Sequence, residues 1–231
     1  KKTLIAAGAD TEPLSSKAIT KLIGDAQNTI EEINFASRKR VLEYDDVLNR
    51  QRQAMYDERN SILDGADLIS ETKNIIEQLA DVKVNKLEGD LDSIVAWTMT
   101  MTPKDELPTF TNETTNDAKA KLIQNWLQNL FDAKVTELGE DVASRITTQV
   151  LLRVIDTRWR IYLQEMDYLK TGIGLRGFGQ RDPLVEYKHE AYDGFENLVA
   201  TMYEDYIRSM LNVEVRVERP DIDALKAKIT D

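Results

Sequence analysis

The chain has 231 residues, 42% hydrophobic and 31% charged, which suits a soluble protein that buries one large core or two small ones. Its formal net charge of −11 argues against a general nucleic-acid-binding protein, which needs a basic surface to displace counterions. The absence of cysteine excludes disulfides, zinc–thiolate sites and thiol nucleophiles, and no stretch approaches the roughly 20 apolar residues of a membrane span.

The first predicted element is one long helix over residues 14–63, which with the residues before it makes a first segment, 1–63. No proline follows Pro13 in this stretch and Gly24 is its only glycine. Apolar residues recur in steps typical of one helix face, at Ile19, Leu22, Ile23, Ala26, Ile30, Ile33, Val41, Leu48, Met55 and Ile62. A helix of about 50 residues is about 75 Å long, so we expect it to be a spine for other parts.

Residues 64–138 differ in composition, with 14 acidic and 7 basic side chains. The pattern predicts short helices at about 67–88, 90–99 and 116–137, around a loop in which Pro103 and Pro108 exclude a continuous helix. We expect a small core from Trp97, Trp126, Leu127, Leu130 and Phe131. This segment is predicted to be a small helical domain.

Residues 139–212 are predicted to form a helical hairpin. Neither glycine nor proline occurs between Gly139 and Gly172, and Asp182-Pro183 is typical of a helix start, with an N-cap acid before proline at the first helical position. The alternation of Val-Glu-Val-Arg-Val at 213–217 predicts an extended C-terminal segment, 213–231. The predicted fold class is therefore all-α.

The sequence TGIGLRGFGQRDP (171–183) matches the glycine spacing of a dinucleotide-binding turn, at Gly172, Gly174 and Gly177. Such a turn follows a β-strand, whereas a long predicted helix precedes this one, and a phosphate loop would need Lys-Ser or Lys-Thr after Gly177. We therefore predict a hairpin tip whose glycines leave the backbone free to take unusual angles. Two interpretations stay open: adaptable contact with another chain, or a turn packed in the protein's own core.

The acidic run Glu43, Asp45 and Asp46 invites a metal-site interpretation, but no histidine is nearby and adjacent residues point about 100° apart around a helix. Two other interpretations remain, a solvated face and a docking face, and the eight basic and eight acidic residues over 14–63 favour the solvated one. We predict no catalytic, cofactor-binding or metal-binding residue in this chain.

Two stretches together resemble the C-terminal part of SecA, the motor ATPase of bacterial preprotein translocation. Residues 26–60 (AQNTIEEINFASRKRVLEYDDVLNRQRQAMYDERN) resemble the start of its helical scaffold. Residues 155–195 (IDTRWRIYLQEMDYLKTGIGLRGFGQRDPLVEYKHEAYDGF) resemble its two-helix finger. Residues 64–138 lie where the family has its more variable helical wing. The resemblance implies a long scaffold helix packed with a two-helix finger (139–212), plus a small wing.

The resemblance also implies roles for individual residues. The fingertip would contact the translocating polypeptide through Ile173, Leu175, Arg176, Phe178 and Gln180. Trp159 matches a tryptophan in a segment that restrains ATP hydrolysis, which implies a regulatory contact. Docking of the family's motor domains would involve Arg38, Lys39, Tyr44, Asp45, Asp46 and Arg52. The tip departs from the family pattern, because Gly174 stands where histidine is common and Phe178 where tyrosine is common.

The motifs of the family's motor domains do not occur in this sequence, so we expect the chain to be a piece of a larger protein whose absent domains bind ATP and Mg²⁺. The resemblance implies preproteins, a SecYEG-type membrane channel and the protein's own motor domains as partners, allows a homodimer, and implies a cytoplasmic location at the inner face of the cell membrane. Two rival hypotheses are a helical chaperone-like or adaptor module without a motor, and a helical hydrolase that uses the acidic run.

Overall fold

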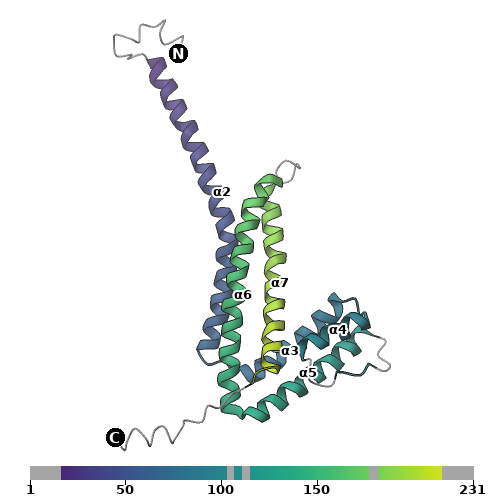
Figure 1. The fold of residues 1–231 in the computed structure, drawn as a ribbon. Coiled ribbons are helices and arrows are strands. Elements are labelled where there is room, and N and C mark those ends of the chain that lie inside the picture. The colour runs from purple at the N-terminus through teal and green to yellow at the C-terminus, as the bar shows by residue number, and fades with distance from the viewer. Residues whose placement is uncertain (1–16, 103–106, 111–114, 177–181, 215–231) are drawn as a thin grey trace, which may run out of the picture. The chain divides into compact units, whose positions relative to one another are not determined.

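The computed structural model describes residues 17–102, 107–110, 115–176 and 182–214. Within these ranges the protein has six helices and no strand, which confirms the predicted all-α class for the described residues (Figure 1). The helices are α2 (Lys17–Leu63), α3 (Leu68–Lys86), α4 (Leu91–Met101), α5 (Asn116–Leu138), α6 (Glu140–Arg176) and α7 (Pro183–Leu211).

Side chains at the helix starts explain why most predicted boundaries hold to within a few residues. Asp67 accepts a hydrogen bond from the backbone nitrogen of Ser70 at 3.2 Å, and Asp90 accepts one from Ser93 at 2.9 Å. Each carboxylate satisfies a backbone N–H that the first turn of a helix leaves unpaired. Asp182 does the same for α7, with 2.9 Å to the nitrogen of Leu184.

One boundary differs from the prediction. Helix α6 continues through Gly172 and Gly174 to Arg176, so these two glycines belong to the helix and not to the loop of the predicted tip. Glycine in a helix costs only about 0.5–1 kcal/mol relative to alanine. Burial of Ile173, which is 2% exposed, favours the helical conformation between them.

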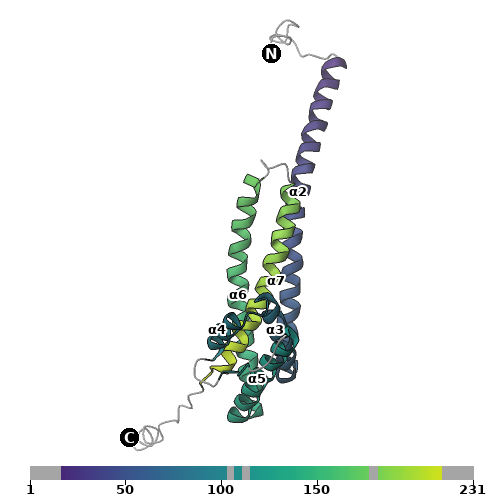
Figure 2. The same ribbon diagram turned by 90° about the vertical axis from the view of Figure 1, so that its right-hand side faces the viewer.

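The chain divides into two compact units. The first unit comprises residues 1–53 and 167–192, and the second comprises 54–166 and 193–231, so α2, α6 and α7 contribute residues to both. The predicted division into segments ending at 63, 138 and 212 stays a prediction. In the first unit, α2 lies beside the start of α7 (Figures 1 and 2).

Packing in the first unit joins α2 to the hairpin. The ring centres of Tyr44 and Tyr187 are 4.8 Å apart, and the side-chain amide of Gln51 donates to the carbonyl oxygen of Ala191 at 2.9 Å. Tyr187 is almost fully buried, and this burial, with the nearby charges of Asp45 and Asp167, raises the pKa of its hydroxyl. These contacts hold residues 44–51 of α2 against α7.

The second unit contains the helices of the wing, residues 64–138, where α3 packs against α5. Its fully buried side chains include Ile76, Ile94, Ile123, Leu127 and Phe131. Of the core predicted from sequence, Trp97, Leu127 and Phe131 are buried, whereas Trp126 and Leu130 are only partly buried.

Gly89 closes the turn between α3 and α4. Its φ is +71°, and a Cβ atom there would lie 2.1 Å from Oδ1 of Asn116, so this turn requires glycine. Lys119, which is also buried, donates from Nζ to the carbonyl oxygen of Gly89 at 2.8 Å. The start of α5 is thereby tied to the turn.

Candidate interaction surfaces

The N-terminal part of α2 carries an apolar stripe that is open to solvent. Its large side chains are each more than half exposed: Leu22, Ile23, Ile30, Ile33 and Val41. Contiguous exposed apolar surface on a soluble protein marks an interaction site, because water contact with it is unfavourable. We name this set the α2 stripe. The N-terminal end of α2 extends past the ends of α6 and α7 (Figure 1).

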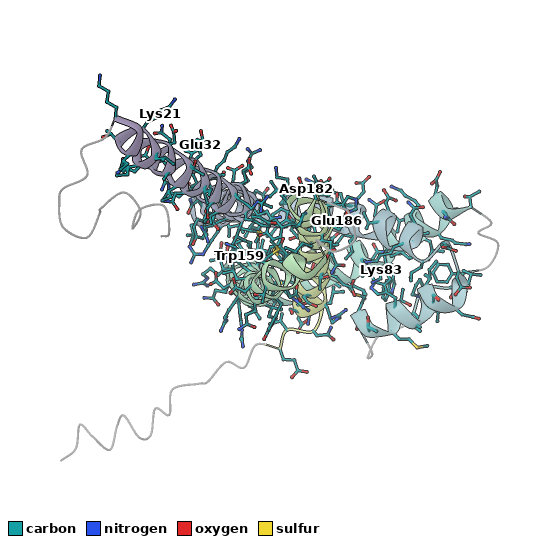
Figure 3. All side chains as sticks on the ribbon, turned by 90° about the horizontal axis from the view of Figure 1, so that it is seen from above. Lys21, Glu32, Lys83, Trp159, Asp182 and Glu186 are labelled. Carbon is teal, nitrogen blue, oxygen red and sulfur yellow. The ribbon has the colours of Figure 1, made fainter. Side chains whose placement is uncertain are left out.

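The α2 stripe continues a face that is covered further along the same helix. Ile33 and Val41 lie in helical register with Tyr44 and Gln51, which contact α7. The face therefore changes from exposed to packed at about residue 44. Phe35 and Leu42, seven residues apart, are exposed on the opposite side of the helix. Figure 3 shows the charged side chains of Lys21 and Glu32 standing out from the same part of α2.

Two of the residues predicted for motor-domain docking make contacts inside the first unit instead. The ring of Tyr44 contacts that of Tyr187 at a tilt of 55°, and the carboxylate of Asp45 pairs with Nζ of Lys170 on α6 at 2.8 Å. The resemblance implied that the long helix packs with the finger, but it did not indicate that Tyr44 and Asp45 make this contact. A docking role for Tyr44 and Asp45 stays a prediction.

The other four predicted docking residues lie on the surface of α2. Asp46 pairs with Arg50 at 2.8 Å, and Arg52 donates to Oδ1 of Asn49 at 2.7 Å. Arg38 and Lys39 are exposed. A shallow hollow beside them is lined by side chains of both charges and one apolar side chain, namely Lys39, Leu42, Glu43, Asp45, Asp46, Asn49 and Lys188. Mixed charges suit contact with a polar protein surface.

Proline substitutions should distinguish the exposed from the packed part of α2. Val47→Pro is expected to destabilise the protein by about 3 kcal/mol or more, because proline removes a backbone hydrogen bond and clashes with the preceding turn where α2 is packed. Val41→Pro should instead reduce helicity N-terminal to residue 41 with a smaller loss, because that part buries no large side chain. Circular dichroism with thermal unfolding measures both effects; equal losses would contradict this division of α2.

The predicted fingertip residues divide into two groups. Ile173 is buried in the first unit, which favours for this residue the interpretation of a turn packed in the protein's own core. Leu175 and Arg176 belong to the last turn of α6, but the structure does not describe their side chains. Phe178 and Gln180 lie outside the described residues altogether. Their contact with a translocating polypeptide stays a prediction.

Trp159, predicted to be regulatory, is half-buried on α6 in the second unit. Its ring centre lies 5.7 Å from that of Tyr162, which is buried and lies 6.0 Å from the ring of Phe195 on α7. This aromatic row joins the two finger helices. The contact with Tyr162 gives Trp159 a packing role in this chain. Its regulatory contact stays a prediction.

The described residues include no group of three or more histidine, aspartate or glutamate side chains placed to hold a metal ion. Over the same residues, every helix is too short or too polar to cross a membrane.

Comparison with known proteins gives one consistent result. The profile of the SecA Wing and Scaffold domain matches residues 13–214. The chain is 38% identical to protein translocase subunit SecA 1 of Thermobifida fusca and 36% identical to protein translocase subunit SecA of Heliobacterium modesticaldum. These alignments cover 94% and 90% of this chain but 24% and 26% of the two relatives, so the chain spans about a quarter of their length.

Proposed function

Because this chain belongs to the SecA family, of which it carries the wing and scaffold domain, we propose that it is the scaffold and finger region of a preprotein translocase motor. ATP is hydrolysed with Mg²⁺ in motor domains outside these 231 residues. The scaffold helix α2 couples those domains to the finger, and the finger moves the preprotein through a SecYEG-type membrane channel.

The α2 stripe is the observation that carries this proposal. Five large apolar side chains on one helix face are left exposed where the face departs from the hairpin. Burying each of them contributes about 1.5–3 kcal/mol, so a partner that covers the stripe gains substantial binding energy. The protein's own motor domains are the partner that the family assignment favours, with Arg38 and Lys39 beside the stripe as polar contacts.

The finger supplies the second half of the mechanism. Leu175, Arg176, Phe178 and Gln180 offer apolar and cationic contacts that suit polypeptides of many sequences better than a shaped pocket would. Binding to the channel then holds the protein at the inner face of the membrane. The second unit, with Trp159 on its first finger helix, relays the state of the motor domains to the tip.

The docking step is tested by placing charge on the α2 stripe of the full-length protein. Ile30→Asp with Ile33→Asp should reduce preprotein-stimulated ATP hydrolysis and transport by roughly tenfold or more, because two buried apolar contacts are lost and two charges are desolvated. Both side chains are exposed in this chain, so its own melting temperature should hardly change. Val82→Asp with Met99→Asp is the matched control, since these wing side chains are also about half exposed.

Unchanged ATP hydrolysis and transport in the Ile30/Ile33 variant would contradict docking on the α2 stripe. A second copy of the protein is the competing occupant. If the variant dissociates a dimer in sedimentation velocity while transport stays normal, the stripe is a dimer interface and the docking proposal is wrong.

A further inference from the structure

One carboxylate in the second unit receives hydrogen bonds from three helices. Oε2 of Glu204 on α7 accepts from Nζ of Lys83 on α3 at 2.8 Å. Its Oε1 accepts from the indole nitrogen of Trp97 on α4 at 3.0 Å and from Arg208 on α7 at 2.7 Å. Nζ of Lys83 also lies 5.3 Å from the ring centre of Trp97, a cation–π distance. Lys83 lies among the wing helices in Figure 3.

Further hydrogen bonds between the wing and the α7 region join uncharged groups or are longer. The hydroxyls of Thr72 and Tyr206 are 2.5 Å apart, and the side-chain nitrogen of Asn212, just after α7, donates to the carbonyl oxygen of Met101 at 2.6 Å. Lys86 donates to Asn197 at 3.4 Å. Charge-assisted hydrogen bonds are about twice as strong as neutral ones, so Glu204 is a stronger polar link at this seam than these three contacts.

The charge on Glu204 is maintained by its neighbours. Its side chain is 18% exposed, and this burial by itself raises the pKa of the carboxyl group. The hydrogen bonds from Lys83 and Trp97 and the positive charges of Lys83 and Arg208 have the opposite and larger effect, so the pKa lies below its usual value. The carboxylate is therefore ionised at neutral pH. Removing the negative charge of Glu204 would deprive two part-buried cations, Lys83 and Arg208, of this carboxylate partner.

The wing helices carry fully buried apolar side chains, among them Ile76, Ile94 and Phe131. Within the wing, α3 packs directly against α5, and this contact does not involve Glu204.

We propose that Glu204 is a positioning residue that holds the wing on α7, and that neutralising its carboxylate releases the wing as an intact folded body. Three donors from three helices meet at this one side chain, whereas α3 and α5 pack against each other without it. A partner that competes for Lys83 or Trp97 would release the wing in the same way, without unfolding it.

Distances between spin labels test this proposal directly, because the chain has no cysteine and labels can be placed at single introduced ones. One pair, Glu77→Cys with Glu165→Cys, spans the exposed faces of α3 and α6 and reports the wing against the scaffold. A second pair, Glu77→Cys with Asn129→Cys, lies within the wing. Pulsed electron paramagnetic resonance gives the distance distribution for each pair.

In Glu204→Gln the wing-to-scaffold distribution should gain a broad, displaced component, with the separated population raised by roughly tenfold or more, because hydrogen bonds to a charged acceptor are stronger than those to a neutral one. The distribution within the wing should stay narrow. Glu196→Gln, the same change at an exposed position of α7, is the matched control and should leave both distributions as in the unchanged protein.

Three results would overturn the proposal. If both distributions stay narrow in Glu204→Gln, this carboxylate does not hold the wing. If the distribution within the wing broadens as well, Glu204 supports folding of the wing and not its position. If Glu196→Gln broadens the wing-to-scaffold distribution equally, the effect comes from the charge of α7 in general.

Discussion

Replacing Ile173 with alanine is expected to lower the free energy of unfolding by about 2–5 kcal/mol, the usual range for a buried isoleucine. The side chain is 2% exposed near the end of α6, and its removal leaves a cavity that the first unit fills only in part. Thermal unfolding followed by circular dichroism should show the loss as about 2–4 °C for each kcal/mol in a protein of this size. A loss below 0.5 kcal/mol would show that Ile173 is not packed.

Phe178 is expected to behave in the opposite way, although it is only five residues further along the chain. If the fingertip contacts preproteins, Phe178→Ala should hardly change the melting temperature of this chain yet severely reduce preprotein transport by the full-length protein. Phe178→Tyr, which keeps the ring, should retain transport. A large loss of stability with normal transport would instead mean that the tip is a packed turn, which would contradict its proposed contact with the polypeptide.

Phe131→Ala should produce the largest loss of stability in the wing, about 3–5 kcal/mol. The Phe131 side chain is fully buried on α5, in the part of the second unit where α3 and α5 pack together. Neighbouring side chains cannot fill the space left by the phenyl ring unless a helix moves, so the contacts that they made with the ring are lost.

Met99→Ala is the control for Phe131→Ala, because its side chain is 52% exposed on α4 and should change stability by no more than about 0.5 kcal/mol. Chemical unfolding followed by tryptophan fluorescence suits both variants, since Trp97 and Trp126 lie in the wing. Similar midpoints for the two variants would mean that the core of the wing is not where the structure places it.

Much of the fold followed from local features of the sequence. The long helix over 14–63 was predicted from the lack of proline and the spacing of apolar residues, and α2 runs from Lys17 to Leu63. The wing helices begin at capping residues such as Asp67 and Asp90, whose side chains bond only three residues ahead. Interactions of such short range depend on little beyond the neighbouring residues, so the sequence alone determines them.

The course of α6 past its first glycines shows where a local rule was insufficient. Gly172 and Gly174 indicated a loop, but the helix includes both, because burial of Ile173 depends on tertiary packing that no local pattern describes. Which part of α2 is packed against other helices and which part is exposed is a second example. Periodicity placed Ile30 and Val41 near one face, but only the folded chain shows that both are exposed while Tyr44, three residues after Val41, meets Tyr187.

By itself, then, the sequence determined the helices, their order and the family, because these depend on short-range contacts and on motifs that can be recognised along the chain. The tertiary structure alone decided which residues meet. Glu204 lies 121 residues from Lys83 and 107 from Trp97, and nothing near any of the three in sequence indicates the others. Such a cluster forms only after the apolar faces of separate helices have packed, since packing brings the charges within hydrogen-bond distance and removes the water that would otherwise screen them.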